Sequence, residues 1–280
     1  MTTTLRPAGP EERAPDGARA RAFDVRVNGR RAGGLRLSAE PPALGGAGRI
    51  EELEIQPEDR RRGRATVAAL AAEEVLRGWG CREAAVALPA GAEGPLALAA
   101  ALGYAERNRF LAKPLPEQPP PLPPGYTARA MGPEEYPAWL EEEQATFAAG
   151  WTGRGLSPAA ARARAEAARA TYLPDGPAGE HTALRVLTHG AGEAGALWVS
   201  TDAPRLRHGV DAFVLSVRVP EERRGRGHGR ALMREAERVC RAAGGRLLGL
   251  NVFAGNVSAL RLYASLGYRP VEIGLAKPLL

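Results

Sequence analysis

An internal repeat constrains the fold of this chain more than any other feature of its sequence. The segment Leu-Ala-Lys-Pro-Leu occurs at residues 111–115 and again at residues 275–279, a shift of 164 positions. The same shift superposes Leu-Gly-Tyr at 102–104 on 266–268, and Arg60 on Arg224. One register therefore runs without a gap from residue 60 to residue 115, and two copies are too few for a solenoid. The sequence predicts a duplicated domain.

The register changes near the beginning of each copy. Gly-Pro-Glu-Glu at residues 9–12 matches residues 132–135 with a shift of 123 positions, so the first copy lacks 41 residues that the second copy has. Most of that segment consists of Ala/Glu/Arg-rich stretches at 133–150 and 158–171, which we predict to be helices.

A proline-rich run at residues 114–125 divides the chain near its middle. Such a run neither continues a helix nor pairs inside a sheet, so we expect an extended connector. The predicted domains are residues 1–113 and 126–280, joined by this linker.

Periodicity predicts the other elements of the second copy. We expect strands at 183–188, 195–201, 212–219, 246–253 and 268–277, and helices at 229–243 and 256–266. This is an α+β pattern with one mixed sheet in each copy.

Composition excludes several classes of protein. With 44% hydrophobic and 25% charged residues, a chain of 280 residues is expected to form about two globular domains. Two cysteines and four histidines without ligand spacing predict no disulfide framework and no metal site. Without a long apolar stretch or a signal peptide, the chain is expected to be cytoplasmic with no membrane partner. The net charge of +6 is spread along the chain, so we expect no nucleic-acid binding, although a mild positive field suits a polyanionic small molecule.

The segment Arg224-Gly-Arg-Gly-His-Gly229 lies between a predicted strand and a predicted helix. Its glycines permit a sharp turn that presents backbone N–H groups at a helix N-terminus, where an anion is favoured. Arg230 stands where a dinucleotide-binding motif would need glycine, so that class is disfavoured. The sequence predicts a phosphate-binding loop, and the alternative is a plain strand–helix turn.

Asn256 and Tyr263 extend this motif. Asn256 is a good N-cap, and Tyr263 follows seven residues later, so both project from one side of a helix. Together with the loop, this segment resembles the GNAT superfamily of acyl-CoA-dependent N-acyltransferases, whose pyrophosphate loop reads Arg/Gln-x-x-Gly-x-Gly/Ala after a strand. Arg224, Gly227 and Gly229 match that loop, and Asn256 and Tyr263 match the family's later asparagine and tyrosine. The resemblance covers roughly residues 126–280.

The resemblance implies two tandem GNAT-like domains, each a mixed, mostly antiparallel sheet flanked by helices, with a V-shaped splay between central strands. Acetyl-CoA, as co-substrate, would lie in the splay, with its pantetheine arm on one strand and its pyrophosphate in the loop. The residues expected at this site are Val217, Val219, Arg224, Gly225, Arg226, Gly227, His228, Gly229, Arg230 and Asn256. The His228 side chain itself is expected to be incidental.

The resemblance also makes Tyr263 the expected proton donor. A phenol of pKa ~10 stays protonated at neutral pH and can share its proton with a leaving thiolate of pKa ~8.5. The alternative for Tyr263 is a plain core aromatic.

The general base is less clearly marked. An alkyl ammonium of pKa ~10.4 is only ~0.04% deprotonated at pH 7, so a lysine-type acceptor needs help. No carboxylate falls in the middle of a splayed strand, where Ser216 and Asn251 are the polar residues. We predict Asp211 acting through water, with a surface charge as the alternative; the other nearby carboxylates are Asp202, Glu221 and Glu222. The extra helical segment adds aromatic residues that could line an acceptor pocket or form core: Tyr136, Trp139, Phe147, Trp151 and Tyr172.

The first copy has lost the family's later residues. Arg60-Arg-Arg-Gly-Arg-Ala65 still fits the loop pattern, but the shift of 164 puts Ala92 and Ala99 at the positions of Asn256 and Tyr263. We predict that this copy is not catalytic and either binds CoA through Arg60, Gly63 and Ala65 or is purely structural. One active and one silent copy is similar to the layout of mycothiol synthases.

The predicted function is transfer of an acetyl group from acetyl-CoA to a primary amine of a small molecule, by direct attack in a ternary complex. The alternatives are acetylation of a peptide or protein amine, and a non-catalytic acyl-CoA sensor or scaffold. The protein is expected to act as a monomer or homodimer.

Overall fold

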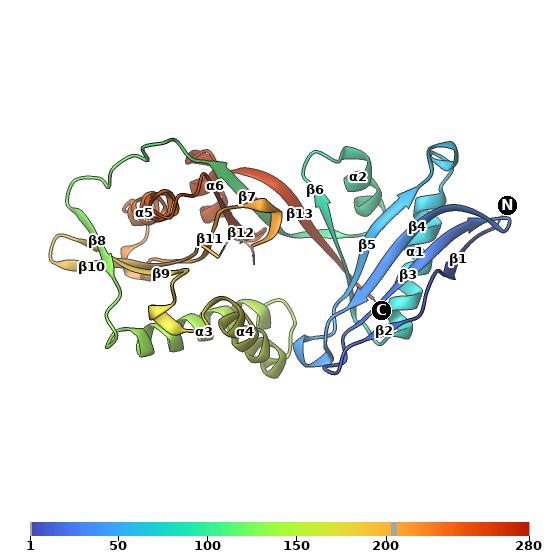
Figure 1. Cartoon of the computed structure of the whole chain (residues 1–280), viewed down its shortest axis with the longest axis horizontal. Helices are drawn as coiled ribbons and strands as arrows, with labels where there is room; N and C mark the ends of the chain where they lie inside the picture. The colour runs from blue at the N-terminus through green and yellow to red at the C-terminus, as the bar shows by residue number, and fades with distance from the viewer. Residues whose placement is uncertain (1, 203–205, 280) are drawn as a thin grey trace. The chain divides into compact units, whose positions relative to one another are not determined.

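The computed structural model describes residues 2–202 and 206–279. They form two compact units, and each unit takes segments from both halves of the chain. Unit 1 comprises the chain up to residue 107, residues 148–164, and the chain from residue 272. Unit 2 comprises residues 108–147 and 165–271. Figure 1 labels the elements of both units.

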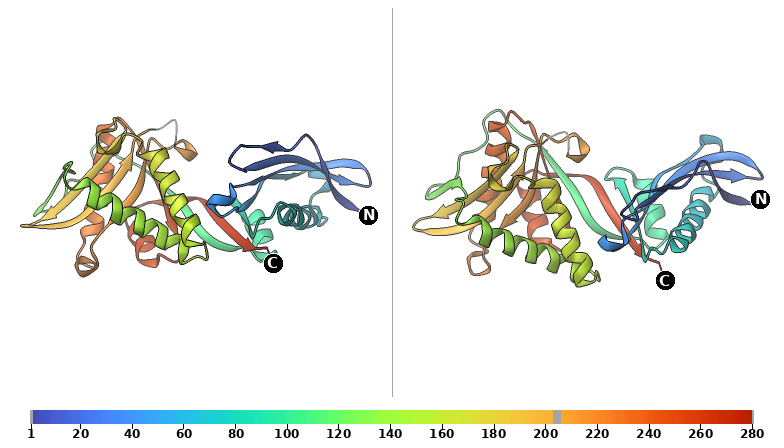
Figure 2. Two further views of the ribbon diagram at one scale, coloured as in Figure 1. Left: turned by 90° about the horizontal axis from the view of Figure 1, so that it is seen from below. Right: turned by 60° about the horizontal axis from the view of Figure 1, so that its bottom comes forward.

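Unit 1 contains a mixed sheet and two helices. Its strand order is β1-β3-β4-β5-β6-β13, with the short β2 (Glu12–Arg13) paired to β3. The strands are β1 (Thr3–Pro7), β3 (Arg19–Val27), β4 (Arg30–Ala39), β5 (Gly48–Ile55), β6 (Glu83–Pro89) and β13 (Arg269–Pro278). The helices are α1 (Arg64–Gly78) and α2 (Glu93–Ala101). Helix α1 lies along the sheet of unit 1 (Figure 2). Its residue Leu76 belongs to the same buried core as Val25 and Leu37.

Unit 2 contains a second mixed sheet, with the strand order β8-β9-β10-β11-β12-β7. Its strands are β8 (Tyr126–Ala130), β9 (Thr182–His189), β10 (Gly192–Ser200), β11 (Ala212–Arg218), β12 (Leu247–Phe253) and β7 (Ala105–Pro114). The helices are α3 (Tyr136–Thr152), α4 (Pro158–Tyr172), α5 (His228–Ala242) and α6 (Val257–Ser265). These bounds agree closely with the predicted helices and strands of the second copy.

Both faces of the unit 2 sheet are covered, and β10 shows how. Successive side chains of a strand point to opposite faces. Leu197 and Val199 join the core under α5, whereas Ala196 and Trp198 join the cluster that contains Trp139 of α3. Figure 1 shows α5 and α3 on opposite sides of these strands. Because both of its faces are buried, β10 needs apolar residues at successive positions instead of alternating apolar and polar residues.

The last strand of each copy completes the sheet of the other copy. Strand β7, from the first copy, pairs antiparallel with β12, from Asn108 opposite Phe253 to Pro114 opposite Leu247. Strand β13, from the second copy, pairs antiparallel with β6, from Glu272 opposite Pro89 to Pro278 opposite Glu83. The sequence analysis gave each copy a sheet made of its own strands, whereas the structure exchanges these two.

The only two lysines of the chain lie on the exchanged strands. Lys113 Nζ is 2.6 Å from Oε1 of Glu237 in α5, and Lys277 Nζ is 2.8 Å from Oε2 of Glu73 in α1. The Glu237 and Glu73 side chains are only 1% and 2% exposed. A buried carboxylate needs a partner, so each exchanged strand brings the cation that its host helix requires.

The 41 extra residues of the second copy are helical, as predicted. Helices α3 and α4 lie between β8 and β9, while the corresponding stretch of the first copy, between β1 and β3, holds the short strand β2. The proline-rich connector has neither helix nor strand from residue 115 to residue 125. The connector runs alongside α5, where Arg234 and Arg241 donate hydrogen bonds to the carbonyl oxygens of Pro121 and Glu117, respectively.

The two parallel central strands of each unit separate, as the predicted V-shaped splay requires. In unit 2, β11 and β12 pair only from Ala212 opposite Leu248 to Val214 opposite Leu250. Beyond that point, the register between β10 and β11 shifts and leaves Leu215 without a partner, a bulge that bends β11. In unit 1, β5 and β6 pair only at residues 48–49 with 84–85.

Candidate active site

The predicted phosphate-binding loop joins the end of β11 to the beginning of α5. Gly225 and Gly227 have φ angles of 77° and 87°, in the left-handed region that favours glycine. Gly227 is the N-cap of α5 and contributes no side chain to its capping. Within the part of the chain that the structure describes, the backbone N–H groups of residues 225–229 find no backbone acceptor. A helix N-terminus with unpaired N–H groups can bind an anion.

Two side-chain hydrogen bonds and one close approach fix this loop. Arg224 Nε donates to the carbonyl oxygen of Val219 at 3.3 Å, and Arg230 donates to Ser265 Oγ on α6 at 2.6 Å. A Cβ added to Gly229 would lie 3.1 Å from Leu262, so the glycine lets α5 and α6 approach closely. The Arg226 side chain, by contrast, is exposed. The backbone of the loop is thus held in place before any ligand arrives.

His228, the first residue of α5, fastens the loop to β8. It is buried, and its Nδ1 lies 2.8 Å from the hydroxyl oxygen of Tyr126. Burial, together with the nearby His189 and the arginines of the loop, lowers the pKa of His228 and favours the neutral ring at neutral pH. In the first copy, Arg64 donates to Thr3 Oγ1 at 3.0 Å in the corresponding position.

Helix α6 carries the predicted asparagine and tyrosine. Asn256 Oδ1 accepts a hydrogen bond from the backbone N–H of Ala259 at 3.1 Å, which confirms the predicted N-cap. Tyr263 is 9% exposed and packs edge-on against Tyr268, with ring centroids 6.0 Å apart. Burial raises the pKa of Tyr263 to about 12, so the phenol keeps its proton at neutral pH.

Asp211 lies at the paired end of β11 and β12. Its Oδ2 accepts hydrogen bonds from the backbone N–H groups of Arg246 and Leu247, at 2.7 and 2.8 Å. The strands are still paired at the next residue, Ala212, and they separate only after Val214. The Asp211 carboxylate therefore ties the two strands together at the closed end of the V.

A different carboxylate reaches the open part of the V. Ser216, which follows the bulge on β11, donates a hydrogen bond from Oγ to Glu143 Oε2 on α3 at 2.8 Å. Burial raises the pKa of Glu143 above the usual range of a glutamate. The sequence analysis named Ser216 as polar but missed Glu143. The available signal was its position four residues after Trp139, on the apolar side of α3.

The aromatic residues of the extra helical segment do not form one group. Trp139 is buried and packs edge-on against Trp198 at 5.8 Å, and Tyr136 and Tyr172 join the same cluster. Trp151 instead belongs to unit 1, where the guanidinium of Arg164 lies 4.5 Å from its ring centroid. The cluster around Trp139 forms an apolar layer between α3 and the sheet.

The first copy keeps the shape of the loop but has no tyrosine at the position of Tyr263. Arg60 Nε donates to the carbonyl oxygen of Ile55 at 2.7 Å, and Gly63 has a φ angle of 74° before α1. Ala99 is buried in α2, and Ala92 begins that helix without a side-chain cap. The backbone of the turn is thus similar in both copies, while the side chains of Asn256 and Tyr263 have no counterpart in α2.

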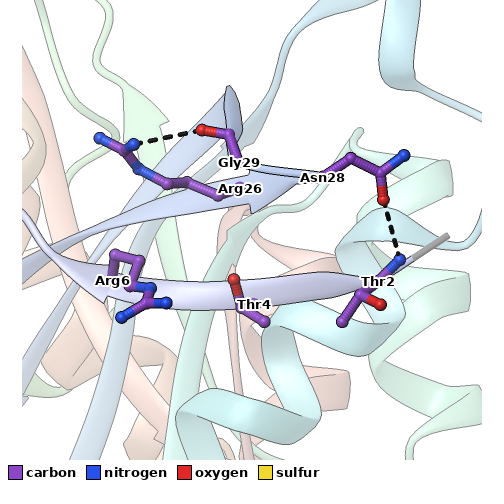
Figure 3. A pocket seen from close by; sticks show the side chains of 6 residues that line it. All are labelled: Thr2, Thr4, Arg6, Arg26, Asn28 and Gly29. Atoms are coloured by element: carbon purple, nitrogen blue, oxygen red, sulfur yellow. Dashed lines mark hydrogen bonds between the residues drawn. The ribbon is translucent and has the colours of Figure 1, made fainter.

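An open pocket of about 560 Å³ lies at the β1–β3 edge of unit 1. Figure 3 shows its lining residues: Thr2, Thr4, Arg6, Arg26, Asn28 and Gly29. Arg26 donates to the carbonyl oxygen of Gly29, so this side chain serves the β3–β4 turn. The lining includes none of the predicted site residues.

Within residues 2–202 and 206–279, none of the helices is both long enough and apolar enough to cross a membrane. No group of three or more His, Cys, Asp or Glu side chains in those residues is arranged to hold a metal ion.

The sequence of this chain is similar to those of known proteins. A model of the acetyltransferase (GNAT) family matches residues 134–268. An uncharacterized N-acetyltransferase, YdgE from Bacillus subtilis (strain 168), is 30% identical over 117 residues, which cover 41% of this chain and 73% of that protein.

Solved structures share the fold over nearly the whole chain. A GCN5-related N-acetyltransferase from Sphaerobacter thermophilus aligns with a TM-score of 0.61 at 22% identity, covering 92% of this chain and 80% of that one. A tandem GNAT protein from the clavulanic acid biosynthesis pathway aligns with a TM-score of 0.53 at 23% identity, covering 96% of this chain and 85% of that one. These similarities support the tandem layout.

Proposed function

Because the chain belongs to the acetyltransferase (GNAT) family, whose members transfer acyl groups from acyl-CoA, we propose that its second copy acetylates a primary amine of a small molecule. Acetyl-CoA is the donor, and the amine attacks it directly in a ternary complex. The observation that carries this proposal is the loop of residues 224–229, which presents unpaired backbone N–H groups at the open end of the splayed strands.

The residues of this region fit a CoA thioester. The N-terminus of α5 and the glycine turn before it provide N–H donors for a diphosphate. Beyond Val214, the edge of β11 that faces β12 has lost its strand partner. We assign the amides of a pantetheine arm to the backbone at Val217 and Val219 along this edge, where the Val219 carbonyl oxygen also accepts the hydrogen bond from Arg224. Asn256 begins α6 beside this region and holds its first turn.

Tyr263 stabilises the leaving group in this proposal. Acetyl-CoA supplies an acyl group already activated as a thioester. A phenol with a pKa of about 12 does not fully protonate a thiolate of pKa ~8.5, because that transfer is uphill. Its contribution is a hydrogen bond to the negative charge that develops on sulfur, with the proton moving as the C–S bond breaks.

Substituting Tyr263→Phe tests this assignment, since phenylalanine keeps the ring packing against Tyr268 and removes the hydroxyl. We expect turnover of acetyl-CoA with a reactive amine to fall by roughly 10- to 10⁴-fold while the Kd for CoA stays the same. Tyr104→Phe, at a buried tyrosine in the core of unit 1, is the matched control and should leave turnover unchanged. Unaltered turnover in Tyr263→Phe would remove the phenol from the mechanism, and a wild-type protein that binds no CoA would overturn the function.

A further inference from the structure

Glu143 differs from the fully buried carboxylates of the described residues, Asp59, Glu73 and Glu237, each of which has a cationic partner. Lys277 pairs with Glu73, Lys113 with Glu237, and Arg30 with Asp59. Within the described residues, Glu143 accepts a hydrogen bond from Ser216 and forms no ion pair. A carboxylate withdrawn from water without a cation is costly unless it serves a ligand.

Among the residues that the structure describes, no neighbouring cation is available to form an ion pair with the Glu143 carboxylate. Arg218 of β11 is the cation that acts on Glu143, but its guanidinium is ion-paired with Glu142 on the same helix. That pair sits beside the Ser216–Glu143 hydrogen bond and is more exposed, with the Glu142 side chain 62% accessible. The carboxylate of Glu143 is left with capacity for one external cation.

The position of Glu143 is that of an acceptor site. Ser216 lies beyond the bulge of β11, where the splay has opened, and its hydroxyl holds the carboxylate against the sheet. Both side chains remain partly exposed, so a small molecule can reach them. Trp139, one helical turn before Glu143, is buried and packs α3 against Trp198 of the sheet. A partly buried carboxylate without an ion-pair partner is a favourable environment for an ammonium group.

We propose that Glu143 binds the ammonium group of a cationic amine acceptor and removes its proton, with Ser216 as its positioning residue. This inference rests on the proposed function, because it assigns the acceptor side of the same reaction. It also names the substrate class as primary amines that are protonated before they bind.

The proton balance is complete without a further reactant. The ammonium gives one proton to the Glu143 carboxylate, and the neutral amine then forms the C–N bond with the thioester carbon. As the C–S bond breaks, the departing sulfur draws the Tyr263 proton while the phenol oxygen recovers one from the protonated nitrogen of the tetrahedral adduct, which becomes the amide nitrogen. Glu143 returns its proton to solvent, so the net products are the amide, free CoA and one proton.

The pH dependence of the rate is the distinguishing readout. Only the ionised carboxylate can accept the proton, so kcat/KM must fall as the pH falls through the pKa of Glu143, which burial raises. The groups that face it are Ser216 and Arg218 from β11 and Glu142 from α3. The Ser216 hydrogen bond favours the ionised form, so Ser216→Ala should move this acidic limb to higher pH.

The experiment uses the full chain with acetyl-CoA and a panel of primary amines: an amino sugar, a diamine and an alkyl monoamine. Release of CoA thiol is measured from about pH 5 to about pH 9, a range that covers the titration of a carboxylate whose pKa is raised by burial. Glu143→Gln keeps the volume and a hydrogen-bonding group for Ser216 but cannot take a proton. We expect it to lower kcat/KM by about 10²- to 10⁴-fold and to abolish the acidic limb, with the Kd for CoA unchanged.

Glu141→Gln is the matched control, because Glu141 is an exposed residue of the same helix, and it should keep wild-type kinetics. Wild-type kinetics in Glu143→Gln, or an acidic limb that Ser216→Ala does not move, would overturn the inference and leave the proposed function standing. Wild-type protein that binds CoA but releases no thiol with any amine would overturn the proposed function together with this inference.

Discussion

Replacing Lys113 with methionine tests whether the exchanged strand is held by a buried charge. Methionine keeps an unbranched chain of similar length and removes the ammonium that lies 2.6 Å from Glu237. The Glu237 side chain is 1% exposed, and its other described partner is the Tyr268 hydroxyl at 3.4 Å. The substitution therefore leaves a carboxylate out of contact with water and almost without partners.

The expected loss of unfolding free energy follows from the burial of Glu237. Removing one member of a buried ion pair costs about 3–5 kcal/mol of unfolding free energy, because the remaining charge is uncompensated. A surface pair of the same unit, Arg169 with Glu166, is worth about 0–1 kcal/mol, so Arg169→Met is the matched control. At about 2–4 °C per kcal/mol for a unit of this size, Lys113→Met should lower Tm by roughly 6–20 °C.

Urea and thermal unfolding followed by circular dichroism measure this difference. The double variant Lys113→Met with Glu237→Leu removes both charges and should recover most of the lost stability, since an apolar pair can replace a buried ion pair at little cost. A loss below about 1 kcal/mol in Lys113→Met, or a double variant no more stable than the single one, would refute the reasoning.

Two further predictions concern the elements that flank the site. Asn256→Ala should cost about 1 kcal/mol of unfolding free energy through loss of the α6 cap, whereas Asn256→Asp should retain it; equal unfolding of all three proteins in urea would contradict the capping role. Gly227→Ala forces an L side chain into a φ of 87°, at a cost of about 1–2 kcal/mol, and should weaken CoA binding in calorimetric titration. Gly91→Ala, where an added Cβ meets open space, is its control, and equal CoA affinity in the two variants would contradict a role for the loop conformation.

Local sequence determined much of this protein. The repeat at a shift of 164 positions identified the duplication, and periodicity placed the helices and all the strands of the second copy except β8 within a few residues of their bounds. The cap at Asn256 and the left-handed glycines of the loop also followed from residue type. These features depend on side chains and backbone dihedrals within one or two turns of chain, which is the range that a pattern of neighbouring residues encodes.

Only the tertiary structure decided which sheet each copy's last strand enters and which carboxylate meets the splay. The apolar pattern of β13 suits either sheet, and its lysine would meet an equivalent glutamate in either, because Glu73 and Glu237 are also related by the shift of 164. Likewise, Asp211 is next to β11 in sequence yet binds the backbone at the closed end of the V, while Glu143 reaches Ser216 from 73 residues away. Buried charges and hydrogen bonds select their partners through packing across the whole chain, so residue order alone does not specify them.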